Sequence, residues 1–214
     1  MIFVTTRTGK ITENIFAVSA VMVNMFVVRH GSSTICIDTG MGNGNIKRGL
    51  AKLGVAPESV SHIFLTHSDT DHAGCIDLFK NARVCLSKNE EQMINGKTPR
   101  KGSRYNRPIN REYALLEDNE TVQIGDMAVK GIETPGHTAG SMSYLVNGEY
   151  LFVGDTMALM RDKVHTFPGF INMDTETEKG SIRKLAKLTG IKMMFTAHSG
   201  YTADFSNAIK EWKT

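Results

Sequence analysis

Histidine and carboxylate side chains gather in one short stretch of this 214-residue chain, the run THSDTDH at 66–72. His67, Asp69, Asp71 and His72 offer imidazole nitrogens and carboxylate oxygens, which are common ligands of first-row metals in proteins. The run follows an apolar segment at 60–65, and a turn after a strand can point several side chains at one spot. The spacing favours a metal site, although a polar loop in which Asp71 caps the next helix would also explain it.

Three more candidate ligands lie farther along the chain, each just after a short apolar segment. His137 lies in the turn TPGHT at 134–138, Asp155 follows the segment 150–153, and His198 follows the segment 193–196. Strand ends are rigid positions, so the fold can bring such side chains together. The expected metal ligands are His67, Asp69, Asp71, His72, His137, Asp155 and His198.

The elements expected around these motifs alternate between strands and helices. Apolar and β-branched segments predict strands at 15–18, 22–28, 34–37, 60–65, 83–86, 121–124, 127–132, 143–146, 150–153 and 193–196. Helical spacing and glycine stops predict helices at 45–53, 73–80, 175–188 and 203–212. This order favours an α/β fold with sheets inside and helices outside.

Composition agrees with one globular domain. Hydrophobic residues make up 41% and charged residues 22% of the chain, which excludes disordered and fibrous classes. No segment approaches the roughly 18 apolar residues of a membrane helix, and the opening MIFVTTRTGK lacks the order of a secretory signal. The three cysteines form no C-x-x-C pair. We therefore expect a reduced, cytoplasmic protein with no membrane partner.

The net charge of +3 is concentrated in one segment, because six basic residues and no acidic one lie between Lys97 and Arg111. A helix followed by a polar loop is expected over 88–112. The loop would attract an anionic small molecule or bind along the backbone of a nucleic acid. Alternatively, it would contact a second subunit in a homodimer or be a solvated loop without a binding role. Tyr105 alone could stack on a base there, so nucleic acid is the weaker alternative. Candidate substrate residues are Arg100, Lys101, Arg104, Arg107 and, after Asp155, His165.

The ordered motifs resemble those of the metallo-β-lactamase superfamily, from about residue 15 to residue 200. The matching segments are VN at 23–24, IDTG at 37–40, THSDTDH at 66–72, PGHT at 135–138, GD at 154–155 and His198. The resemblance implies an αββα sandwich as a single domain over 1–214, with a basic insertion or loop at about 88–112. It also implies two divalent metal ions at one edge of the sheets.

The resemblance further implies a role for each candidate. One ion would lie near His67, Asp69 and His137, the other near Asp71, His72 and His198, with Asp155 between them. Asp38 and Thr138 would hold ligands in place without binding metal. Asp71 is also expected to take part in catalysis.

Asp69 departs from the usual family pattern. Most hydrolytic members read H-x-H-x-D-H, whereas this sequence reads H-x-D-x-D-H. The additional carboxylate is a hard oxygen ligand, which shifts the metal preference from zinc alone toward manganese or iron, with zinc still the first expectation.

The resemblance predicts a hydrolase in which a metal-bridging hydroxide attacks an ester, thioester, lactone or similar anionic small molecule. A diiron redox protein is a second hypothesis, because flavodiiron proteins carry an acidic residue at the position of Asp69. A metal-dependent nuclease is a third, because DNA-uptake competence proteins carry Asp there. A non-catalytic binding protein on the same scaffold is the fourth.

Overall fold

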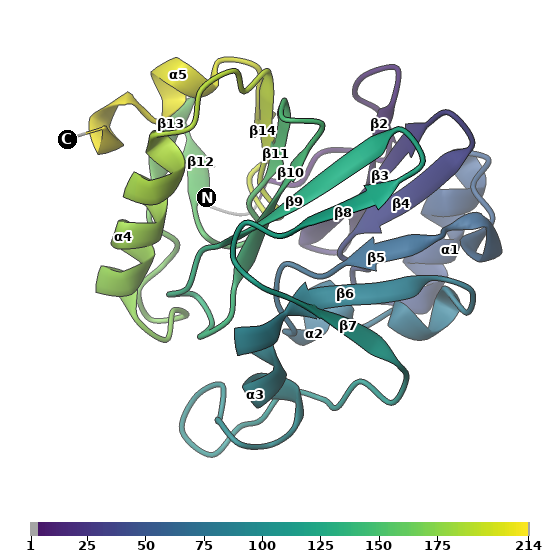
Figure 1. Cartoon of the computed structure of the whole chain (residues 1–214), viewed down its shortest axis with the longest axis horizontal. Helices are drawn as coiled ribbons and strands as arrows, with labels where there is room; N and C mark the ends of the chain where they lie inside the picture. The colour runs from purple at the N-terminus through teal and green to yellow at the C-terminus, as the bar shows by residue number, and fades with distance from the viewer. Residues whose placement is uncertain (1–3, 214) are drawn as a thin grey trace.

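Two β-sheets pack face to face and carry helices on their outer surfaces, in a computed structural model that describes residues 4–213 (Figure 1). One sheet has seven strands in the order β1-β2-β3-β4-β5-β6-β7, and the other has six in the order β15-β14-β11-β10-β9-β8. The expected αββα sandwich is therefore confirmed. The first three residues of the expected domain, and of the opening segment discussed above, lie outside the described residues, as does residue 214.

The seven-stranded sheet is antiparallel over its first four strands and parallel over its last four. Its strands are β1 (Gly9–Lys10), β2 (Ile15–Ala20), β3 (Val23–His30), β4 (Ser33–Ile37), β5 (His62–Phe64), β6 (Arg83–Ser87) and β7 (Tyr113–Leu116). Helix α1 (Asn43–Lys52) covers its outer face, where Ile46 and Leu50 are fully buried against Val18 and Val27. Parallel strands place their carboxyl ends at one edge, so Asp38 after β4 lies beside Thr66 after β5.

The six-stranded sheet is antiparallel except where β11 pairs with β14. Its strands are β8 (Thr121–Ile124), β9 (Met127–Glu133), β10 (Met142–Val146), β11 (Tyr150–Phe152), β14 (Met193–Phe195) and β15 (Tyr201–Thr202). Helices α4 (Thr175–Ala186) and α5 (Phe205–Ala208) lie on its outer side (Figure 1). Asp174 begins α4 by accepting a hydrogen bond from the Thr177 amide.

The core between the sheets is rich in aromatic rings. Phe26, Phe152 and Phe195 have ring centroids 4.6–5.4 Å apart, and Phe64 meets Tyr144 edge to face at 5.2 Å. Each sheet also buries its outer face under helices, which explains why successive residues of β3 are buried from Val23 to Val28. The three free cysteines, Cys36, Cys75 and Cys85, are also buried.

Several elements differ from those expected. Strand β7 and the hairpin of β12 (Ala158–Met160) and β13 (Lys163–His165) were not predicted. The helix expected at 73–80 is instead α2 (Thr70–Ala73) followed by a 3-10 turn at Ile76–Leu78, so it begins inside the metal motif. The helix expected at 203–212 is divided into α5 and a 3-10 turn at Lys210–Trp212. The Trp212 indole of this turn donates to Val164 O at 3.0 Å.

The segment 88–112 consists of a 3-10 turn at Lys88–Glu90, helix α3 (Glu91–Ile94) and a long irregular stretch that leads to β7. We name residues 95–112 the basic loop; it extends beyond α3 at one end of the molecule (Figure 1). Within residues 4–213, no helix combines the length and apolar character needed to cross a membrane.

Candidate metal centre

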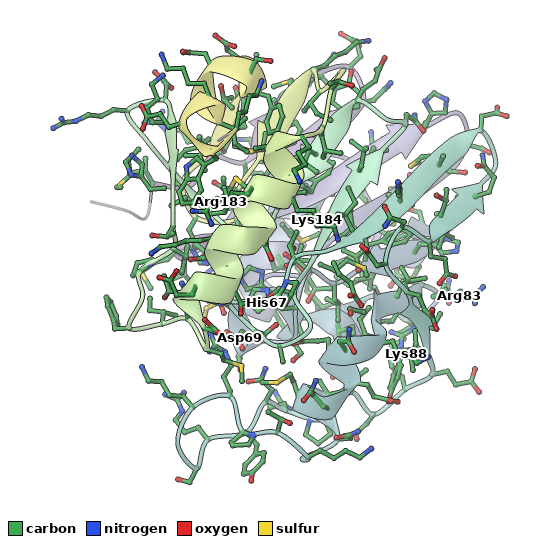
Figure 2. The ribbon with its side chains drawn as sticks, turned by 60° about the vertical axis from the view of Figure 1, so that its left-hand side comes forward. His67, Asp69, Arg83, Lys88, Arg183 and Lys184 are labelled. Atoms are coloured by element: carbon green, nitrogen blue, oxygen red, sulfur yellow. The ribbon has the colours of Figure 1, made fainter. Side chains whose placement is uncertain are left out.

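The seven candidate ligands converge at the edge where strands of both sheets end. His67 and Asp69 follow β5, while Asp71 and His72 belong to α2. The second sheet supplies the other three from the segments after β9, β11 and β14: His137, Asp155 and His198. Figure 2 shows His67 and Asp69 close to each other. The sandwich therefore brings together residues as far apart in sequence as His67 and His198.

Asp155 lies at the middle of the cluster. Its Oδ2 is 3.4 Å from His137 Nε2 and 3.3 Å from His198 Nε2, and its Oδ1 is 3.5 Å from His72 Nε2. The side chain is almost fully buried. Asp155 thus faces imidazoles from both halves of the cluster, as a shared ligand would.

Asp69 and Asp71 divide the remaining contacts between them. Asp69 Oδ2 lies 3.6 Å from His67 Nε2 and 3.4 Å from His137 Nε2. Asp71 Oδ2 lies 3.5 Å from His72 Nε2 and 3.3 Å from His198 Nε2. We call His67, Asp69 and His137 the first ligand group, and Asp71, His72 and His198 the second ligand group; in each, the ligating atoms lie within 4.8 Å of one another.

Three buried side-chain atoms at the centre of the cluster show whether metal ions fit there. His67 Nε2, His72 Nε2 and Asp155 Oδ1 are buried and have no hydrogen-bond partner within residues 4–213. Such orphaned polar atoms are costly unless something binds them. Tetrahedral ligands at about 2.1 Å from an ion lie about 3.4 Å apart, which matches the observed spacing of 3.3–3.6 Å. The residues present therefore fit divalent metal ions.

Opposite charges prevail over burial in setting the protonation of the cluster. Burial disfavours the carboxylate form of Asp155, yet His198 and His72 hold the pKa of Asp155 well below its usual range. Burial likewise disfavours the imidazolium form of His198, yet Asp155 and Asp71 raise the pKa of His198 to about 9. A cation entering the cluster therefore meets ionised carboxylates and must displace a proton from histidine.

Asp38 fixes the orientation of His72. His72 Nδ1 donates to Asp38 Oδ2 at 2.8 Å, which leaves the Nε2 lone pair pointing inward. Asp38 also accepts from the Thr66 amide at 2.7 Å and from the Thr66 hydroxyl at 2.8 Å. The Thr66 hydroxyl in turn lies 3.1 Å from His67 Nδ1, so one carboxylate orients two imidazoles.

Replacing Asp38 with asparagine should weaken Zn²⁺ binding by about 10- to 100-fold, the usual effect of removing a partner of a ligating histidine. The amide would present a donor to His72 Nδ1 and favour the tautomer that carries its proton on Nε2. Competition with a chromophoric chelator measures the affinity, and Asp126→Asn, in an exposed turn, is the matched control. Equal affinity in Asp38→Asn and wild type would contradict this role.

Thr138 contacts a different group from the one expected. Its Oγ1 donates at 2.7 Å to Glu90, rather than to a ligand. Glu90, which the sequence did not reveal, is fully buried and also accepts from the Ser68 amide, the Ser68 hydroxyl and the Gly140 amide, at 2.8, 2.6 and 3.2 Å. This carboxylate therefore links the two loops that carry His67 and His137.

A second unpredicted carboxylate supports His137. His137 Nδ1 donates to Asn172 Oδ1 at 3.0 Å, and Asn172 Nδ2 donates to Glu178 Oε2 at 2.8 Å. Glu178 also accepts from the Phe167 amide at 3.0 Å. Burial raises the pKa of Glu178 to about 8.

Glu178 should make the folded chain less stable as the pH rises. Between pH values of about 4.5 and 8 the unfolded chain releases a proton that the folded chain keeps, so the free energy of unfolding falls. Glu178→Gln removes this titration, and the stability of the variant relative to wild type should improve steadily from about pH 5 to about pH 8. Urea unfolding with EDTA present measures it. A pH-independent difference would contradict the raised pKa.

The basic loop reaches the cluster through Arg100. Arg100 Nε lies 2.9 Å from both oxygens of Asp69, and Arg100 Nη2 lies 3.0 Å from His137 Nε2. A hollow of about 290 Å³ opens beside Asp69 and Asp71 and is lined on the loop side by Arg100, Lys101, Arg104, Tyr105 and Asn106. Three of the four predicted basic residues thus face the ligands.

Two predicted substrate residues lie elsewhere. Arg107 lines a neighbouring smaller hollow with Ser68 and Thr70. His165 is exposed on β13 and lines another hollow with Leu159 and Lys163, which includes none of the seven candidate ligands. The hairpin of β12 and β13 carries His165.

Comparison with known proteins agrees with this geometry. The chain is similar to a probable metallo-hydrolase of Methanocaldococcus jannaschii, with 29% identity over 72% of this chain and 64% of that protein. It is also similar to a probable polyketide biosynthesis zinc-dependent hydrolase of Bacillus subtilis, with 34% identity over 58% of this chain and 50% of that protein. The chain thus spans less than two thirds of the length of these relatives.

The fold is also found in solved structures. A metallo-beta-lactamase family protein of Thermus thermophilus superimposes with a TM-score of 0.72 over 94% of this chain and 79% of that one, at 21% identity. The family model described as the Metallo-beta-lactamase superfamily matches residues 18–198, a range that contains all seven candidate ligands. This chain therefore belongs to the metallo-β-lactamase superfamily.

Proposed function

We propose that this chain is a metal-dependent hydrolase that uses two divalent ions to cleave an ester, thioester, lactone or similar small molecule with an anionic portion. The observation that carries this proposal is the set of orphaned, inward-facing ligand atoms directly beside a cationic hollow. The Bacillus subtilis relative, named as a zinc-dependent hydrolase, supports the same class of reaction.

The two ligand groups would each hold one ion, with Asp155 between them. Such ions activate water near neutral pH and polarise a carbonyl oxygen. Asp71 remains about one-third exposed, and we assign it to exchange a proton with water or the leaving group. Phe167 packs its ring 5.1 Å from His137 and 5.6 Å from His198, which keeps bulk water from that side.

The basic residues would bind the anionic portion of the substrate. Lys101 and Arg104 line the hollow that opens onto Asp69 and Asp71. A fixed cluster of cations raises the local concentration of an anion and orients it toward the ligands. The exposed rings of Tyr105 and Phe170 are available to the apolar part of the same molecule.

Elemental analysis combined with a substrate panel tests the proposal. We expect between one and two equivalents of zinc, manganese or iron per chain, together with turnover of at least one ester, thioester or lactone that stops when a chelator removes the metal. Failure to bind metal in metal-replete medium would overturn the proposal.

A diiron redox protein is the second candidate, favoured by the third carboxylate that Asp69 adds to the cluster. Two equivalents of iron with oxygen uptake driven by a separate electron donor, and no turnover of the ester panel, would select it.

A further inference from the structure

Arg100 uses the same ligand atoms that an ion in the first ligand group would need. Its guanidinium donates to both oxygens of Asp69 at 2.9 Å and to His137 Nε2 at 3.0 Å. The Nε2 of a neutral imidazole has one lone pair, and His137 directs its Nδ1 proton to Asn172. A metal ion and Arg100 therefore cannot both bind His137 Nε2.

The arginine is a strong competitor because it cannot give up its charge. A guanidinium stays protonated in proteins. Here its Nε lies 2.9 Å from both oxygens of Asp69, and its Nη2 reaches His137 at the same time. The side chain is only 11% exposed, and Asn106 Nδ2 adds a further hydrogen bond to Asp69 at 2.9 Å. Asp69 is thus already paired with a cation.

The local fold holds Arg100 at this position. Arg100 N donates to Arg104 O at 2.7 Å and Arg104 N donates to Lys101 O at 2.9 Å, which closes a tight turn at the tip of the basic loop. Gly102 occupies the left-handed region at φ +56°, as such a turn requires. The Lys101 ammonium also donates to Phe170 O across the hollow.

The rest of the cluster is not blocked in this way. His67 Nε2, His72 Nε2 and Asp155 Oδ1 have no hydrogen-bond partner within residues 4–213 and lie close enough to share one ion. An ion can therefore enter beside His72 without displacing Arg100.

We propose that Arg100 is a built-in competitor of the metal in the first ligand group, so that the chain binds one ion tightly and a second only when Arg100 withdraws. This inference rests on the proposed metal-dependent function. It assigns to one residue of the basic loop the control of whether the centre holds one ion or two.

Equilibrium dialysis against Zn²⁺, with metal content measured per chain, tests this inference. Wild type should bind a second ion at least about 10-fold more weakly than the first, and Arg100→Ala should tighten the second ion at least about 10-fold. Lys97→Ala is the matched control, because it removes the same charge from an exposed position of the same loop. The affinity of Lys97→Ala for the second Zn²⁺ ion should stay within about 2-fold of that of wild type.

Mn²⁺ provides a second readout that does not depend on activity. At two equivalents, electron paramagnetic resonance should show mainly isolated ions in wild type and coupled pairs in Arg100→Ala, with circular dichroism showing that the variant is folded. Equal or weaker binding of the second ion in Arg100→Ala would overturn the inference and leave the proposed function standing. Failure of wild type and variant alike to bind Zn²⁺ would overturn both.

Discussion

Asp155→Ala is expected to lower kcat/KM at least about 10³-fold and to reduce the zinc bound per chain below that of wild type. Asp155 faces His72, His137 and His198 at 3.3–3.5 Å, so it touches both ligand groups. Metal ions supply several kcal/mol of transition-state stabilisation, and each 1.36 kcal/mol corresponds to a tenfold change in rate. Steady-state kinetics and elemental analysis on the same preparation measure both quantities.

The control for this substitution is Asp126→Ala, which removes a carboxylate from an exposed turn and should leave both quantities unchanged. Circular dichroism must show that Asp155→Ala retains the fold, so that lost turnover is not lost structure. A folded variant that keeps the metal content of wild type and turns over within about 10-fold of it would show that the centre is assigned wrongly.

Glu90→Ala is expected to lower the free energy of unfolding by about 3 kcal/mol or more, a larger loss of stability than in the other variants considered. The carboxylate accepts four hydrogen bonds while fully buried, from two donors of Ser68 and one each of Thr138 and Gly140. Removing it leaves each donor without its partner, at about 1–3 kcal/mol for a buried group. Urea denaturation followed by circular dichroism measures the change.

Glu91→Ala serves as the neighbouring control. Glu91 accepts one hydrogen bond, from the Tyr113 hydroxyl at 3.1 Å, and should cost less than about 1 kcal/mol. The variants thus separate the buried network from the general effect of losing a carboxylate from this segment. A loss below about 1 kcal/mol in Glu90→Ala would mean that water replaces the four interactions.

The sequence predicted those parts of the molecule that depend on residues close together in the chain. Apolar runs that end in His or Asp predicted both the strands and the side chains at their carboxyl ends, and the structure brings all seven candidates to one edge. The order of the elements indicated an α/β fold, and the αββα sandwich was implied by the family resemblance of the ordered motifs. A supporting role for Asp38 followed from the family resemblance, and in the structure a hydrogen bond of 2.8 Å joins it to His72.

The unpredicted parts depend on contacts between distant segments. Glu90 reads as an ordinary helical carboxylate, because nothing nearby in sequence shows that Ser68 and Thr138 bind it. Glu178 reads in the same way, because the stretch before α4 that supplies its partners, Phe167 and Asn172, has no periodic pattern. The basic loop was recognised from its charge, but the contact of Arg100 with Asp69 spans 31 residues and has no local signature. The hairpin that carries His165 was not predicted either, because its two strands have only three residues each.

Trp212 gives the molecule a built-in optical reporter. It is the single tryptophan of the chain, and it packs on the β12–β13 hairpin through Val164 O and beside Arg183 of α4. Its fluorescence therefore reports how the C-terminal layer, made of α4, α5 and the 3-10 turn at Lys210–Trp212, packs on the six-stranded sheet. A fluorescence transition that coincides with the loss of overall secondary structure would mean that this layer and the ligand-bearing edge unfold as one cooperative unit.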